Sequence, residues 1–81
     1  MDKAFYKKKI IDLQKKISDE REAKKRDNES FARYIKNTTS ASSKASYKKQ
    51  KIDKSAYHDR QIEYYKREIA RAREDLKRCK K

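Results

Sequence analysis

The chain has 81 residues, of which 48% are charged and 33% hydrophobic, and its formal net charge at pH 7 is +13. This length allows one small domain, and the composition is typical of a long helix or coiled coil and not of a thick globular core. Gly and Pro are absent, which removes helix breakers and excludes phosphate-cradling loops, nucleophile elbows and dinucleotide fingerprints. No apolar run exceeds three residues and there is one cysteine, so we expect no transmembrane segment, no internal disulfide and no cysteine zinc site.

A first helix is predicted over residues 3–36, with Asp2 as its N-terminal cap. Its apolar residues recur at gaps of four and three, which marks one face of a helix. They are Tyr6, Ile10, Leu13 and Ile17. The same rhythm next reaches three polar positions, Glu20, Lys24 and Asp27. We interpret this polar stretch as a loosely packed or locally splayed coiled coil, with a binding face for an acidic or hydrated partner as the alternative.

A run of hydroxyl residues at 37–44 predicts a bend, because Ser, Thr and Asn side chains compete with the helix for backbone hydrogen bonds. Apolar and aromatic residues flank the run on both sides, so we expect the chain to reverse there with Phe31, Tyr34 and Ile35 opposite Tyr47 and Ile52. Asn37 is the expected left-handed residue of this glycine-free turn. Four residues are equally usable as the cap of the next helix: Thr39, Ser40, Ser42 and Ser43.

A second helix is predicted over residues 45–80, with an unbroken apolar rhythm in its C-terminal half. That rhythm comprises Ile62, Tyr65, Ile69, Ala72, Leu76 and Cys79. The two predicted helices match in length, which an antiparallel pair requires. The fold class is therefore all-α, a single helical-hairpin domain over residues 1–81, with a continuous parallel coiled coil as the alternative. The residues predicted to form a self-association seam are Ile10, Leu13, Ile17, Ile62, Tyr65, Ile69 and Leu76.

His58 is the only histidine and lies where the apolar rhythm of the second helix shifts phase. Neighbouring residues on a helix point in different directions, so His58 and Asp59 do not face each other. No array of Cys, Asp or Glu with ligand spacing surrounds it. We interpret His58 as a half-buried or exposed helix residue, and we expect no catalytic residue, no metal and no cofactor.

The acid-free window between Glu29 and Asp53 combines positive side chains with tyrosines. This pairing suits phosphate contact and base stacking. An equally good interpretation is that the tyrosines pack at the hairpin tip while the lysines face water. The candidate contacts for an anion or nucleic acid are Arg33, Lys36, Lys44, Tyr47, Lys48, Lys49 and Lys51.

Three stretches carry a family resemblance. Residues 35–44, reading IKNTTSASSK, and residues 48–53, reading KKQKID, precede a helix with Ile62, Ile69 and Leu76, and residues 13–19 read LQKKISD on the first arm. The pattern resembles the N-terminal coiled-coil region of bacterial Toll/interleukin-1-receptor-type and related antiphage defence proteins. The resemblance implies a helical module that assembles or positions an effector. The NAD-cleaving activity of that family is not expected from these residues, since they include no effector domain.

The sequence thus favours a non-enzymatic, basic coiled-coil module for self-association and scaffolding, forming a homo-oligomer. The alternative is a basic hairpin that binds nucleic acid or an acidic protein, as its charge suggests. We expect no small-molecule substrate. The cysteine usage suits the cytoplasm.

Overall fold

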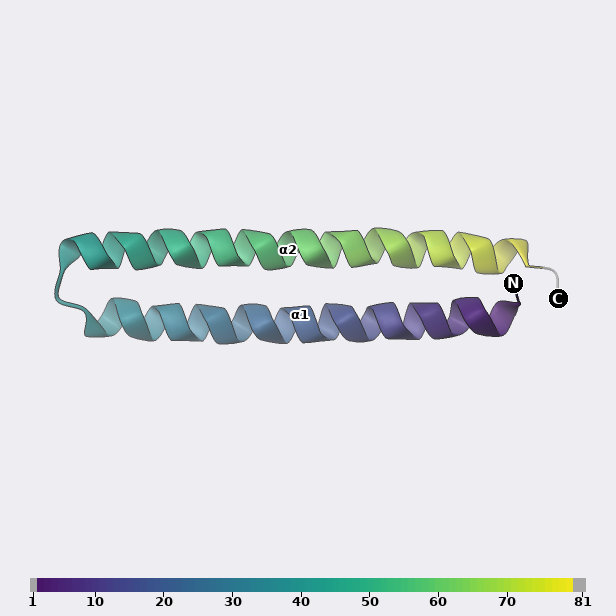
Figure 1. Ribbon diagram of the computed structural model, residues 1–81, viewed down its shortest axis with the longest axis horizontal. Helices are drawn as coiled ribbons and strands as arrows, with labels where there is room; N and C mark the ends of the chain where they lie inside the picture. The colour runs from purple at the N-terminus through teal and green to yellow at the C-terminus, as the bar shows by residue number, and fades with distance from the viewer. Residues whose placement is uncertain (1, 80–81) are drawn as a thin grey trace.

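The computed structural model describes residues 2–79, and it folds them into an antiparallel pair of long helices. Helix α1 spans Lys3–Asn37 and helix α2 spans Ala41–Arg78, with 35 and 38 residues. At 1.5 Å per residue each helix is about 50–57 Å long, which accounts for a molecule of 63 × 14 × 11 Å. Figure 1 shows the two helices side by side along their whole lengths, with both termini at the same end. The predicted helical hairpin is confirmed.

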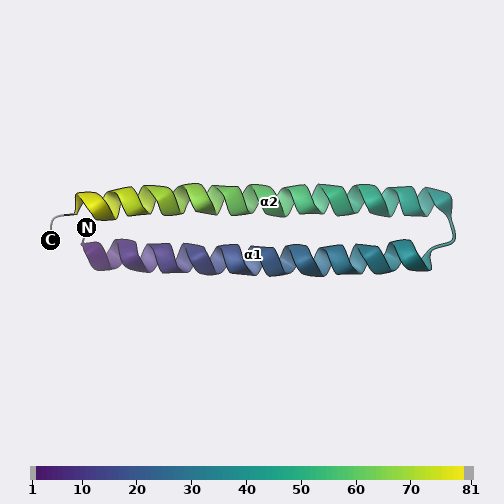
Figure 2. The same ribbon diagram turned by 180° about the vertical axis from the view of Figure 1, so that it is seen from behind.

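The turn is shorter than the sequence indicated. Thr38, Thr39 and Ser40 are the three residues between α1 and α2, and the view from behind shows this short link at the end opposite the termini (Figure 2). Ser40 is the N-cap of α2, since its side-chain oxygen accepts a hydrogen bond from the backbone N–H of Ser43 at 3.3 Å. Helix α2 therefore begins at Ala41 and not at residue 45. Because Ser40 alone caps the helix, the small residues that follow it are helical.

Asn37 does not adopt the expected left-handed conformation. It belongs to α1, and no residue between 2 and 79 has a positive φ angle. Extended backbone at Thr38 and at Ser40 turns the chain instead, and the Thr38 N–H donates to the Tyr34 carbonyl to close the last turn of α1. The reversal therefore needs no glycine.

The ends near the chain termini follow simple capping rules. Asp2 accepts a hydrogen bond from the backbone N–H of Phe5 at 3.0 Å, as predicted for the N-cap of α1. Helix α2 ends at Arg78, with Cys79 as its half-buried C-cap. Cys79 thus lies just beyond the helix that was expected to reach residue 80, and residue 80 itself lies outside the described residues.

A thin apolar core occupies the half of the hairpin that contains the termini. Leu13 and Ile17 of α1 meet Ile62 and Ile69 of α2, each 7–8% exposed, and Ile10 and Tyr65 pack against them. Ala72 is also buried, at 1% exposure. Neither helix between residues 2 and 79 is apolar over a stretch long enough to traverse a bilayer.

Candidate functional site

The middle of the hairpin is held by a polar cluster centred on the buried side chain of His58. His58 is only 7% exposed, and both of its ring nitrogens face carboxylates of α1. Its Nδ1 contacts the Glu20 carboxylate, and its Nε2 lies 2.6 Å from Oδ2 of Asp27. Glu20 and Asp27 are seven residues apart, so they lie on one face of α1 with two turns between them. The imidazole is therefore clamped along the helix axis by one carboxylate on each side.

Two further contacts join the helices next to this clamp. The Ser55 hydroxyl donates a hydrogen bond to Oδ1 of Asn28 at 2.9 Å. Lys24 Nζ donates to Oδ1 of Asp59 at 2.7 Å. No buried side-chain nitrogen or oxygen among residues 2–79 lacks a hydrogen-bond partner. The polar stretch of α1 is thus joined to α2 by side-chain contacts, and the helices are not splayed there.

The geometry favours a protonated imidazole. A neutral histidine donates one hydrogen bond, whereas the imidazolium donates from both nitrogens, as two flanking carboxylates require. The hydrogen bond to Asp27, supported by the bond and the charge of Glu20, raises the pKa of His58 above its usual 6.5, while burial opposes the shift. The Tyr57 ring packs edge-on against the imidazole with 5.5 Å between centroids. Below this raised pKa, His58 is therefore a charged group inside an otherwise weak interface.

The sequence interpretation of His58 as half-buried or exposed was wrong. The phase shift near His58 comes from a polar residue that occupies a buried position opposite two acids. The signal was present: Glu20 and Asp27 continue the apolar rhythm of the first helix, and His58 precedes Ile62 and Tyr65 at gaps of four and three. Considering both helices together would have paired the polar gap in one with the single histidine in the other.

The contacts of this cluster run between the two helices. Its two carboxylates bind opposite nitrogens of one ring and do not converge on a common point. Within residues 2–79 no group of three or more His, Cys, Asp or Glu side chains is placed to hold a metal ion. The clamp is best described as a structural charge cluster that joins the helices.

The predicted cationic contacts lie at the hairpin tip, but they do not form a single patch. Lys44, Lys48 and Lys51 are spaced by four and three residues and share one side of α2, whereas Lys49 points away from them. Arg33 contacts the Ser30 hydroxyl at 3.4 Å. Tyr47 is half-buried and packs on Tyr34 with 5.4 Å between ring centroids, as the fold-back predicted. None of the tip cations forms an ion pair within the described residues.

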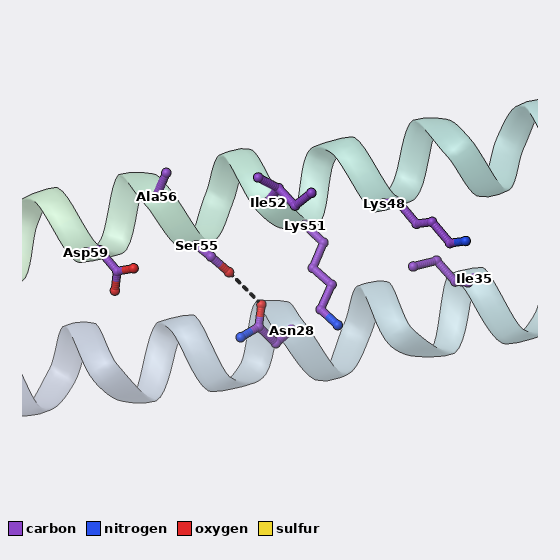
Figure 3. Close-up of a pocket in the computed structure, with 8 residues that line it drawn as sticks. All are labelled: Asn28, Ile35, Lys48, Lys51, Ile52, Ser55, Ala56 and Asp59. Carbon is purple, nitrogen blue, oxygen red and sulfur yellow. Dashed lines mark hydrogen bonds between the residues drawn. The ribbon is translucent and has the colours of Figure 1, made fainter.

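An open groove runs between the helices next to the tip. Its volume is about 650 Å³, and Figure 3 shows Lys48 and Lys51 reaching from α2 toward α1 along it. Ile52, expected to pack against α1, instead remains 68% exposed at this groove. The full lining is Asn28, Ile35, Lys48, Lys51, Ile52, Ser55, Ala56 and Asp59.

The predicted seam residues lie at the contact between α1 and α2 of one chain. Leu13, Ile17, Ile62 and Ile69 form the core, with Ile10 and Tyr65 against it and Leu76 half-buried near the termini. The apolar side chains left on the surface are different ones. They are Phe5, Ile11, Tyr34, Ile52, Tyr57 and Tyr64, each 46–68% exposed.

Comparisons with known proteins do not extend this description. No family model matches the chain, and no curated protein or solved structure matches it either.

Proposed function

We propose that this protein is a non-enzymatic helical module that assembles with further copies of itself. The observation that carries the proposal is the mismatch between a thin core and the exposed apolar surface. Five hydrophobic side chains are buried in the described hairpin, while Ile11 is 63% and Ile52 68% exposed. Covering such a side chain contributes up to about 1.5–3 kcal/mol. Two helices alone cannot cover both of their sides, whereas a bundle of hairpins can.

The charge distribution determines where copies can meet. Residues 13–29 and 53–69, which form the middle of the hairpin, contain ten cationic and nine acidic residues, a net charge of +1. The tip, residues 30–52, carries +6, and so does the remaining terminal part of the sequence. Ile11 and Ile52 adjoin residues 13–29 and 53–69 in sequence, so copies that pack through their middles cover both side chains and avoid most of the repulsion between like charges. The remaining repulsion is screened by salt, so self-association strengthens as salt is added.

Sedimentation equilibrium tests the proposal. We expect an average mass above the monomer mass of 9.8 kDa at micromolar concentration, increasing between low and high salt. The double variant Ile11→Ser and Ile52→Ser should shift the mass toward the monomer, because it removes the two most exposed aliphatic side chains. The matched control is Ala32→Ser with Ala70→Ser, which alters two exposed residues of the same helices. A strictly monomeric, fully helical wild type at both salt concentrations would refute self-association.

A second function, binding of an anionic partner at the tip, is favoured by a separate observation. Between Ser30 and Ile52 the sequence has six cations and no acid, and these cations form no ion pair within the described residues. Such a surface attracts nucleic acid or acidic protein. This binding weakens with salt, opposite to self-association, so titrations at two salt concentrations separate the two functions. A labelled single-stranded oligonucleotide is the first probe, followed by electrophoretic shift.

The setting in an antiphage defence protein stays a prediction from the resemblance. In that setting the hairpin would hold copies of an effector together. The test is whether fusing the hairpin to an inert monomeric reporter makes the reporter oligomeric, with the Ile11→Ser and Ile52→Ser variant as the control.

A further inference from the structure

The groove beside the tip combines an aliphatic side with a cationic side. Ile35 of α1 and Ile52 and Ala56 of α2 supply the apolar lining, and Ile52 is the most exposed large hydrophobic residue among residues 2–79. Lys48 and Lys51 lie on the same stretch of α2 and extend toward α1 (Figure 3). A surface of this kind recognises a ligand that has both apolar groups and negative charges.

The shape of the groove favours a helix as the ligand. Two helices that lie side by side leave a groove between them, and a third helix can pack in it as in a helical bundle. The lining on α2 runs from Lys48 to Asp59, about 16 Å or three turns of helix. A partner helix of similar length would present apolar residues at spacings of three and four to Ile35 and Ile52, as in other helix-in-groove complexes.

The charges of the lining indicate that the partner helix is acidic and where along the groove its carboxylates would lie. Lys48 and Lys51 have no carboxylate partner within the described residues, whereas Asp59, at the other end of the groove, is paired with Lys24 at 2.7 Å. Carboxylates on the ligand are therefore favoured at the tip end and disfavoured near Asp59. Residues 30–52 carry six cations and no acid, which favours a partner of opposite charge at the tip end of this groove.

Nucleic acid suits the tip cations but not this lining. Single strands bind through stacking on exposed aromatic rings, and no aromatic residue lines the groove. Tyr34 and Tyr47, which pack on each other at the tip, lie outside the groove lining. The aliphatic lining would stay unused beneath a phosphate backbone.

We propose that this groove, lined by Ile35, Ile52, Ala56, Lys48 and Lys51, binds an acidic amphipathic helix of a partner protein. The inference rests on the second function proposed above, binding of an anionic partner, and specifies the partner class and its site. The bound helix would turn the tip half of the hairpin into a three-helix bundle. Its apolar side would cover Ile52, and its acidic residues would pair with the two lysines.

The experiment uses the whole chain and a labelled synthetic helix with leucines at spacings of three and four flanked by glutamates. Binding is followed by fluorescence anisotropy. A scrambled peptide of the same composition, polyglutamate and a single-stranded oligonucleotide serve as comparison ligands. Circular dichroism of each protein variant checks that the hairpin stays folded.

Two matched pairs of variants locate the binding site. Lys48→Gln with Lys51→Gln is compared with Lys25→Gln with Lys54→Gln, which removes the same charge from exposed positions outside the groove and outside the tip. Ile52→Ser is compared with Ile11→Ser, a similarly exposed isoleucine on the other helix. We expect each groove variant to lower the affinity for the amphipathic peptide about tenfold, while each control variant changes this affinity by less than about threefold.

Each outcome decides between the proposals. Equal binding of the scrambled peptide, or equal loss in the groove and control variants, would overturn the groove site and leave general charge attraction. Binding of the oligonucleotide without the amphipathic peptide would overturn the acidic-helix inference while retaining the anionic-partner function. Binding of none of the probes at low salt would overturn both.

Discussion

Deprotonating His58 should destabilise the hairpin. The imidazolium donates to Glu20 and Asp27 at once, whereas neutral imidazole retains one of these bonds and turns a lone pair toward the other carboxylate. Because the pKa of His58 is raised in the folded state, its contribution to stability is fully present below the unfolded pKa of about 6.5 and is lost as pH rises through the folded pKa. Stability should therefore fall on the alkaline side of pH 6.5.

The size of this effect follows from the bonds involved. A hydrogen bond to a charged group contributes about 1.5–3 kcal/mol, and His58 is buried enough for this range to apply. In a domain of this size each kcal/mol changes the melting temperature by about 4–8 °C. We expect a decrease of roughly 6–24 °C in melting temperature across the titration of His58.

The assay is thermal and urea unfolding from pH 5.5 to 9, followed by circular dichroism at constant protein and salt concentration. His58→Gln is the reference, because it keeps a polar side chain at this position but does not titrate. The difference between wild type and variant isolates the contribution of His58, because all other side chains are the same in both proteins. The charged clamp would be refuted if the stability of wild type and variant changed in parallel from pH 6 to 9. It would also be refuted if the stability of the wild type increased relative to that of the variant with rising pH.

Three other predictions concern the contacts that hold the hairpin. Leu13→Ala should lower the free energy of unfolding by about 2–4 kcal/mol in urea titrations, while Ile11→Ala, at an exposed position, should change it by less than about 0.5 kcal/mol; equal losses would contradict the assigned core. Ser40→Ala should cost about 1 kcal/mol through loss of the N-cap bond to Ser43, whereas Ser42→Ala should be nearly neutral, and the reverse order would place the cap elsewhere. A double-mutant cycle at Lys24 and Asp59 should give a coupling below about 1 kcal/mol, because both side chains are partly exposed; a coupling of several kcal/mol would show that this pair acts with the His58 clamp.

The sequence was sufficient for the antiparallel hairpin, because its signals are local. The apolar rhythms at Leu13 and Ile17 and at Ile62 and Ile69 each mark one face of a helix, and the hydroxyl run between them marks the reversal. The exact turn was not predictable in the same way. Four residues could cap the second helix, and the choice of Ser40 depends on how the two helices align.

The polar cluster was missed for a related reason. Its parts are separated by 31 and 38 residues in sequence, and each is unremarkable on its own helix. Glu20 and Asp27 alone indicate a weak seam, and His58 alone indicates an irregular one. Their meaning depends on the alignment between helices, which a periodicity within one helix does not contain. The same holds for the groove, since Ile35 and Ile52 were expected to pack together but line an open furrow.

The polar cluster can fix that alignment better than the apolar core can. Apolar residues spaced by three and four tolerate a slip of one heptad, because one aliphatic contact replaces another. A slip of seven residues would instead place His58 near Ile17 or near Phe31 and would leave at least one of its carboxylates without the imidazolium. A buried charge separated from its partner costs several kcal/mol. Since a buried ion pair adds little net stability over an apolar layer of similar volume, we infer that the clamp contributes mainly by destabilising wrong alignments, and that the three-residue turn and the clamp together select one register for the hairpin.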